Sequence, residues 1–101
     1  MKLYRYQLEP EAQEDLERLY QVMVDAAPEV ADKALEHIYA NFRILEISPH
    51  SCRKAASVDG KVLRELIIKF GRSGYVALFE ITSEELVSIL AIKHQRESDY
   101  H

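Results

Sequence analysis

The sequence predicts an α+β fold with the element order β-α-α-β-β-β: a four-stranded antiparallel sheet with a helical hairpin packed on one face. Two features predict this class. Apolar residues recur at intervals of three and four through the first half of the chain, which is typical of amphipathic helices. The second half holds three apolar runs separated by short turns, which is typical of an antiparallel meander. Packing the two against one core gives a two-layer design.

The opening residues predict a strand followed by a helix. Residues 3–8, "LYRYQL", alternate apolar or aromatic with polar side chains, which indicates a short strand. Pro10 suits the first turn of a helix, because its missing N–H costs nothing there. The helix that follows has an apolar stripe made of Ala12, Leu16, Leu19, Tyr20 and Met23.

A second helix is predicted from about Pro28 to residue 47. Its apolar stripe contains Ala31, Ala34, Leu35, Ile38, Phe42 and Leu45, and "SPH" at 48–50 ends it. Because the two helices are joined by only a few residues, we expect an antiparallel hairpin. Residues 51–60 are predicted to be a polar, irregular loop.

Three strands are predicted at 62–70, 75–81 and 86–93, joined by "GRSG" and "TSEE". Alternation along the first of them puts Leu66 and Ile68 on one side with Arg64. Glu65, Ile67 and Lys69 lie on the other side. If the helices cover the more apolar side, Lys69 lies on the open face of the sheet.

Length and composition favour a single globular domain over residues 1–101, with 48% apolar residues. No run approaches the roughly 20 apolar residues that a membrane helix needs, so no membrane association is expected. The opening segment has no apolar core of a signal peptide. Cys52 is the single cysteine, which favours a cytoplasmic location.

Charge is divided unevenly along the chain, whose net charge is −4. Residues 1–50 hold five basic against ten acidic residues, whereas residues 53–72 hold six basic against two acidic ones. Proteins that grip nucleic-acid phosphates usually carry an overall positive charge. Direct nucleic-acid binding is therefore not expected, although a local basic surface remains available for another partner.

Polar and titratable residues follow the last predicted strand, in "KHQRESDY" at 93–100. His94 could move protons near neutral pH, but a recognition surface or a solvated tail fits the cluster better than catalysis. The four histidines have no ligand-like spacing, so no metal site is expected. No phosphate-cradling glycine loop is present, and we expect no cofactor.

The last three predicted strands carry a family resemblance. "RELIIKFGRSGYVALFEI" followed by "VSILAIKHQRESDY" resembles the core of the RelE/ParE superfamily of type II toxins, and most closely its ParE, or plasmid-stabilisation, branch. The close match covers about 62–100, and the opening half agrees in element order and in "LEPEAQEDLERLY". The resemblance implies the RelE/ParE toxin fold.

This superfamily implies two activities, and individual residues favour one of them. The mRNA-cutting RelE branch has an arginine after the Gly-Tyr of its middle strand, where this chain has Val76. Ile67 replaces a lysine of that branch, and His94 stands near a further arginine position. Lys69 and Tyr100 do match. Because stabilising a phosphoryl transition state needs several cations together, ribosome-dependent cleavage is not expected.

The ParE branch implies a toxin that causes growth arrest by binding DNA gyrase, with no catalytic residues of its own. It also implies a ParD-like antitoxin and a toxin–antitoxin hetero-oligomer. The residues predicted to bind the target are Arg64, Lys69, Arg72, Lys93, His94, Arg96 and Tyr100.

Two alternatives remain open. One is a RelE-like endoribonuclease that uses Lys69 as a phosphate clamp, His94 as an acid and Tyr100 as a base. The other is a relative that binds a partner without toxicity.

Overall fold

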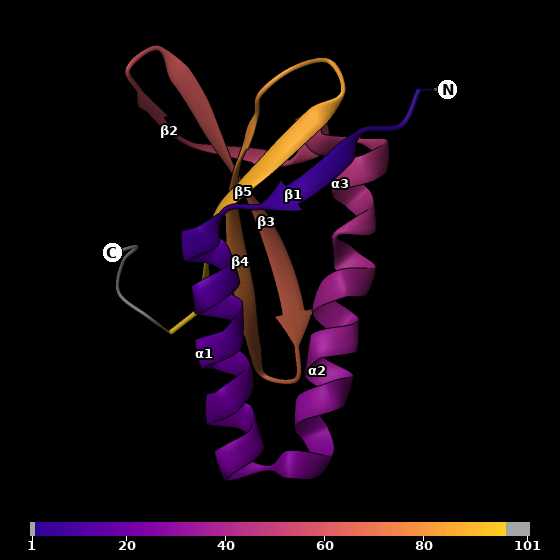
Figure 1. The fold of residues 1–101 in the computed structure, drawn as a ribbon, viewed down its shortest axis with the longest axis vertical. Coiled ribbons are helices and arrows are strands. Elements are labelled where there is room, and N and C mark those ends of the chain that lie inside the picture. The colour runs from indigo at the N-terminus through magenta and orange to yellow at the C-terminus, as the bar shows by residue number, and fades with distance from the viewer. Residues whose placement is uncertain (1, 97–101) are drawn as a thin grey trace.

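The computed structural model describes residues 2–96 as helices packed on one face of a five-stranded sheet (Figure 1). The predicted α+β class is confirmed. In chain order the elements are β1 (Arg5–Leu8), α1 (Pro10–Ala26), α2 (Pro28–Asn41), α3 (Arg43–Ile47), the 3-10 turn η1 (Pro49–Ser51), β2 (Arg53–Val58), β3 (Lys61–Phe70), β4 (Ser73–Ile81) and β5 (Leu86–His94). In Figure 1, α1 and α2 stand side by side as the predicted antiparallel hairpin.

The sheet has the strand order β1-β5-β4-β3-β2, and the prediction of four antiparallel strands is wrong in two respects. A fifth strand is present, and β1 pairs with β5 in parallel. The helical layer joins β1 to the rest of the sheet, so no tight turn forces antiparallel pairing there. The meander β3-β4-β5 is antiparallel as predicted.

The predicted loop at 51–60 contains η1 and β2. All six residues of β2 are exposed, so "RKAASV" lacks the alternation that marks a half-buried strand. Asp59 and Gly60 connect β2 to β3 with φ angles of 51° and 78°. An Asp-Gly pair with two positive φ angles is typical of a two-residue hairpin, and this signal could have located the strand.

The predicted second helix divides at Phe42 into α2 and α3. The Phe42 N–H donates to the carbonyls of both Ile38 and Tyr39, so the helix tightens there without unwinding. Phe42 itself is fully buried and meets Tyr6 of β1 edge to face, with ring centroids 5.3 Å apart. The tightened turn therefore anchors the helical layer on β1.

The core lies between the helices and the adjacent face of the sheet. Its largest fully buried side chains are Phe42, Phe79, Ile38, Leu45, Ile68, Ile89, Ile92 and Val87. Leu66 and Ile68 are buried whereas Lys69 is exposed, which confirms the predicted faces of β3. The opposite face of β3, β4 and β5 carries no helix, as Figure 1 shows.

Candidate functional site

The helix-free face of the sheet has an apolar centre. Strand register places Ile67 of β3, Val76 of β4 and Lys93 of β5 in one row across the three strands. Their neighbours Ile68, Ala77 and Ile92 point into the core on the other face. The next positions on β4 and β5, Leu78 and Ala91, continue the apolar centre. We call this row with its flanking residues the open face.

Charged residues frame the open face at both ends. Lys69 is exposed near the β3–β4 turn, and its backbone carbonyl lies 2.7 Å from His37 Nε2 on α2. Toward the other end, Arg53 Nη2 lies 3.0 Å from Glu65 Oε1, so the charge of Glu65 is neutralised within the sheet. The end near Lys69 is therefore the cationic end of the open face.

His94 lies on the helix side of β5, and not beside Lys69 and Lys93. Its Nδ1 accepts a hydrogen bond from the Arg96 backbone N–H, so Nε2 carries the ring hydrogen and donates to Ser73 Oγ, 3.1 Å away. Its ring meets Tyr75 edge to face, with centroids 5.5 Å apart. These contacts hold His94 as a packing residue that fixes the end of β5.

The other predicted target-binding residues are distributed between two regions. Arg72 is exposed in the β3–β4 turn and Arg96 in the turn after β5, and both lie at the same end of the sheet as Lys69. Arg64 lies five residues before Lys69 on β3, about 16 Å away along the strand, on the helix side. Tyr100 lies outside the described residues. The structure thus groups Lys69, Arg72, Lys93 and Arg96 and separates Arg64 from them.

Arg64 holds the segment that leads into β2. Its Nη1 donates to the carbonyls of His50 and Cys52 at 3.2 and 2.8 Å. The nearby Cys52 thiol is half-buried, and burial raises its pKa, although the positive charge of Arg64 opposes that shift. Arg64 therefore has a structural role that the sequence did not reveal.

The half-buried environment of Cys52 predicts that its thiol reacts slowly with alkylating reagents. Because a raised pKa keeps the thiol protonated, we expect iodoacetamide at pH 8 to alkylate folded Cys52 several-fold more slowly than the urea-unfolded chain. Mass spectrometry of timed samples measures both rates, with a cysteine peptide in the same urea as a control for the reagent. Faster alkylation of the folded protein would mean that Arg64 outweighs burial.

Asp15 of α1 is a buried acidic residue whose contact with β5 the sequence analysis missed. β1 ends opposite Ile89, and a bulge at Leu90 follows, so the next part of β5 has no strand beside it on that side. Asp15 Oδ2 of α1 accepts the buried Ile92 N–H there at 2.9 Å. The signal was present in the sequence, because Asp15 interrupts the apolar stripe of α1 between Ala12 and Leu16.

Acid–base groups are few on the described part of the open face. No histidine lies beside Lys69 or Lys93 on it within residues 2–96. On the helix side, Tyr75 donates to Met23 Sδ at 3.0 Å, and burial raises the pKa of its phenol, so it stays protonated at neutral pH. Over the same residues, no group of three or more histidine, cysteine or acidic side chains could hold a metal ion. None of the described helices is long and apolar enough to span a membrane.

Comparison with known proteins identifies the family. The family model for the ParE toxin of the type II toxin–antitoxin system parDE matches residues 6–99. The chain belongs to the ParE family of type II toxin–antitoxin toxins. The superfamily resemblance of its last three strands is thereby confirmed.

Two individual proteins are similar to this ParE-family toxin over most of its length. Toxin RelE3 of Caulobacter vibrioides is 32% identical over 91 residues, which cover 90% of this chain and 94% of that protein. A solved structure described as the chromosomal ParDE toxin–antitoxin system from P. aeruginosa has a TM-score of 0.74. It is 24% identical, and the match covers 90% of this chain and 95% of that one. This second likeness shows that the two chains share the fold.

Proposed function

We propose that this ParE-family toxin arrests growth by binding DNA gyrase and holding it on broken DNA, with no bond-breaking step of its own. The row Ile67–Val76–Lys93 carries the proposal, because two of its three side chains are apolar. A surface that stabilises the dispersed charge of a cleaved phosphate needs several cations together. An apolar centre with a cationic edge is instead the composition of a protein-binding surface.

The cationic end of the open face is the proposed contact with the target. Lys69, Arg72, Lys93 and Arg96 surround the β3–β4 turn and the end of β5, where Lys93 is half-buried and the other three are exposed. Charges on the rim of an interface mainly steer a partner and fix its register. His94 supports this surface from the helix side through Ser73, and Arg64 lies outside it.

The proposed partner in the resting cell is a ParD-like antitoxin, bound in a toxin–antitoxin hetero-oligomer. Membership of a type II family supports an antitoxin, and the structurally similar chain comes from a ParDE system. A disordered segment that folds on the toxin could wrap a large surface of this small chain. Gyrase acts on the chromosome, so the proposed site of action is the cytoplasm.

Purified gyrase tests the proposal. Supercoiled plasmid, gyrase and ATP are incubated with the toxin, and detergent and protease then release any DNA that gyrase holds broken. We expect linear plasmid to accumulate with the toxin and to disappear when the toxin is premixed with the antitoxin encoded beside it. Plasmid that stays supercoiled, with no linear DNA at saturating toxin, would reject the gyrase target.

A double variant tests the cationic end of the open face. Lys93→Ala with Arg96→Ala is expected to weaken gyrase binding about tenfold, because both substitutions remove charge from the proposed rim. The affinity is measured by surface plasmon resonance, and circular dichroism checks the fold. Lys2→Ala with Lys33→Ala removes the same charge from exposed positions elsewhere and serves as the control. Equal affinities for the two double variants would move the target surface away from this end.

A ribosome-dependent ribonuclease is the second candidate. Two observations favour it: Lys69 stands exposed on the open face, and one relative carries the name RelE3. Its proposed acid, His94, lies on the opposite side of the sheet from Lys69 and Lys93, which counts against it.

A further inference from the structure

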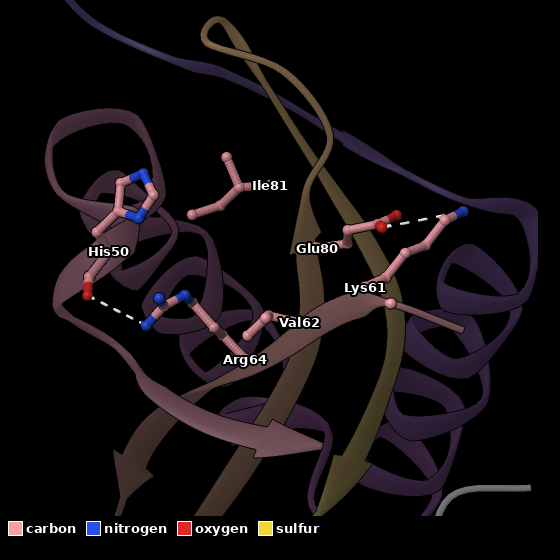
Figure 2. Close-up of a pocket in the computed structure, with 7 residues that line it drawn as sticks. His50, Lys61, Val62, Arg64, Glu80 and Ile81 are labelled. Carbon is pink, nitrogen blue, oxygen red and sulfur yellow. Dashed lines mark hydrogen bonds and ion pairs between the residues drawn. The ribbon is translucent and has the colours of Figure 1, made fainter. Parts of the chain in front are cut away.

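A pocket of about 390 Å³ lies on the helix side of the sheet, where the β2–β3 hairpin leaves the body (Figure 2). η1, the start of β3 and the end of β4 form its walls. Its lining residues are His50, Gly60, Lys61, Val62, Arg64, Glu80 and Ile81. In Figure 2, His50 and Arg64 lie together at one end, Glu80 and Lys61 lie at the other, and Val62 and Ile81 lie between them.

Arg64 is the half-buried cation of this pocket, and its orientation is fixed. Nη1 is engaged by the His50 and Cys52 carbonyls at 3.2 and 2.8 Å. Two other cations of the hairpin have carboxylate partners: Arg53 pairs with Glu65 at 3.0 Å, and Lys61 with Glu80 at 4.0 Å. Arg64 forms no ion pair with any residue between 2 and 96. A partly buried charge without a counter-charge is a natural anchor for an anion.

The remaining donors of Arg64 have the geometry of a carboxylate receptor. With both Nη1 hydrogens engaged by carbonyls, Nε and Nη2 still present N–H groups, and this edge of a guanidinium binds a carboxylate through two parallel hydrogen bonds. Preorganisation lowers the ordering cost of binding, because the backbone already holds the guanidinium in place.

The rest of the pocket selects among anions. Val62 is 39% exposed and Ile81 half-buried, so the ligand must bring apolar surface as well as charge. At the far end Lys61 and Glu80 lie 4.0 Å apart as an ion pair, so that end adds little net charge and Arg64 remains the anchor for an anion. A side-chain carboxylate next to an aliphatic residue matches Arg64 at one end of the pocket and Val62 and Ile81 in its middle.

We propose that this pocket receives an aspartate or glutamate side chain from a partner polypeptide, with Arg64 as its anchor and Val62 and Ile81 contacting the adjacent aliphatic residue. Identifying that polypeptide as the antitoxin rests on the proposed function. The proposal that the pocket binds a carboxylate does not rest on the proposed function, because it follows from the fixed Arg64 guanidinium and the apolar lining. The pocket lies far from the cationic end of the open face, so toxin bound there could still present the open face.

The first experiment uses short peptides and does not depend on toxicity. The 15N-labelled protein is titrated with acetyl-Leu-Glu-Leu-amide, with its Gln analogue, and with inorganic phosphate. We expect the Glu peptide alone to shift the amide signals of Lys61, Val62 and Ile81 and the Arg64 Nε signal. Equal shifts with the Gln peptide, or none with either, would overturn the proposal. A stronger response to phosphate would overturn the assignment to a carboxylate.

Val62→Glu gives the decisive variant. Residues 62 and 64 point to the same face of β3, about 7 Å apart, so the new carboxylate can pair with Arg64 and occupy the pocket from within. Because Val62 is partly exposed and Arg64 keeps its carbonyl contacts, we expect the fold to survive and peptide binding to fall about tenfold. Val58→Glu is the matched control: Val58 is 51% exposed and lies outside the pocket. Equal peptide binding by the two variants would contradict the pocket.

The second experiment separates the pocket from the proposed function. Affinity for the antitoxin encoded beside the toxin is measured for the wild type, Val62→Glu and Val58→Glu. We expect a selective loss of about tenfold or more for Val62→Glu. If the antitoxin binds all three equally, the proposed function stands and its antitoxin does not use the pocket. If the antitoxin binds none of them, the proposed function fails, and the peptide titration still decides whether the pocket takes carboxylates.

Discussion

Replacing Gly74 with alanine is expected to lower the free energy of unfolding by about 3 kcal/mol or more. Gly74 is the second residue of β4 and pairs with Lys69, next to the tight β3–β4 turn. A Cβ atom at this position would overlap the Ile68 carbonyl oxygen and would also come within 3.0 Å of Lys69 Cα. All the conflicting atoms are backbone, so no side-chain rotation relieves the overlap, and β3 and β4 must separate.

Gly71→Ala is the matched control for this prediction. Gly71 lies in the same turn with a φ of 63°, but nothing lies within 4 Å of a Cβ built there. The cost is then only the left-handed backbone conformation, about 1 kcal/mol. Urea denaturation followed by circular dichroism measures both variants. A Gly74→Ala protein no less stable than Gly71→Ala would contradict the close approach of β4 to Ile68.

Asp15→Ala is expected to cost about 2 kcal/mol of folding stability. The substitution removes the acceptor of the buried Ile92 N–H and leaves that donor without a partner beyond the end of β1. It also removes the carboxylate that Arg18 approaches to 3.8 Å. Amide hydrogen exchange should localise the damage, with Ile92 losing protection before the centre of β4 does.

Two variants separate the hydrogen bond from the charge. Asp15→Asn keeps an acceptor oxygen, so its loss of stability should be smaller than that of the alanine variant. Glu14→Ala removes an exposed carboxylate one residue away and should change stability by less than about 0.5 kcal/mol. If Asp15→Ala behaved like Glu14→Ala, the account of how α1 caps β5 would be wrong.

Much of the fold could be predicted from the sequence, because an element with one buried face repeats its apolar residues at the period of a helix or a strand. The stripes of α1 and α2 and the alternation in β3, β4 and β5 all face one core, and those elements occur close to their expected positions. β2 was not predicted because all of its residues are exposed. Its sequence therefore lacks the alternation of apolar and polar residues that marks a half-buried strand. The parallel pairing of β1 with β5 depends on the path of the whole chain, and no local pattern encodes it.

The candidate site could be predicted only in part, for a related reason. Alternation placed Lys69 on the open face, and the structure agrees. It could not place His94 against Tyr75 or Arg64 against the Cys52 carbonyl, because those contacts join segments that are brought together only by folding. Proximity of polar residues along the chain grouped His94 with Arg96, whereas His94 packs against Tyr75 and Arg96 is exposed in the turn after β5.

The claim at the centre of this account is that the toxin's open face binds and does not cleave. Purified toxin is added to ribosomes translating a defined mRNA, and primer extension maps every new 5′ end. The account predicts the same ends with and without toxin, at concentrations that saturate gyrase. New ends within the ribosomal A site that vanish in Lys69→Ala would contradict it and would assign this ParE-family chain to the ribonucleases.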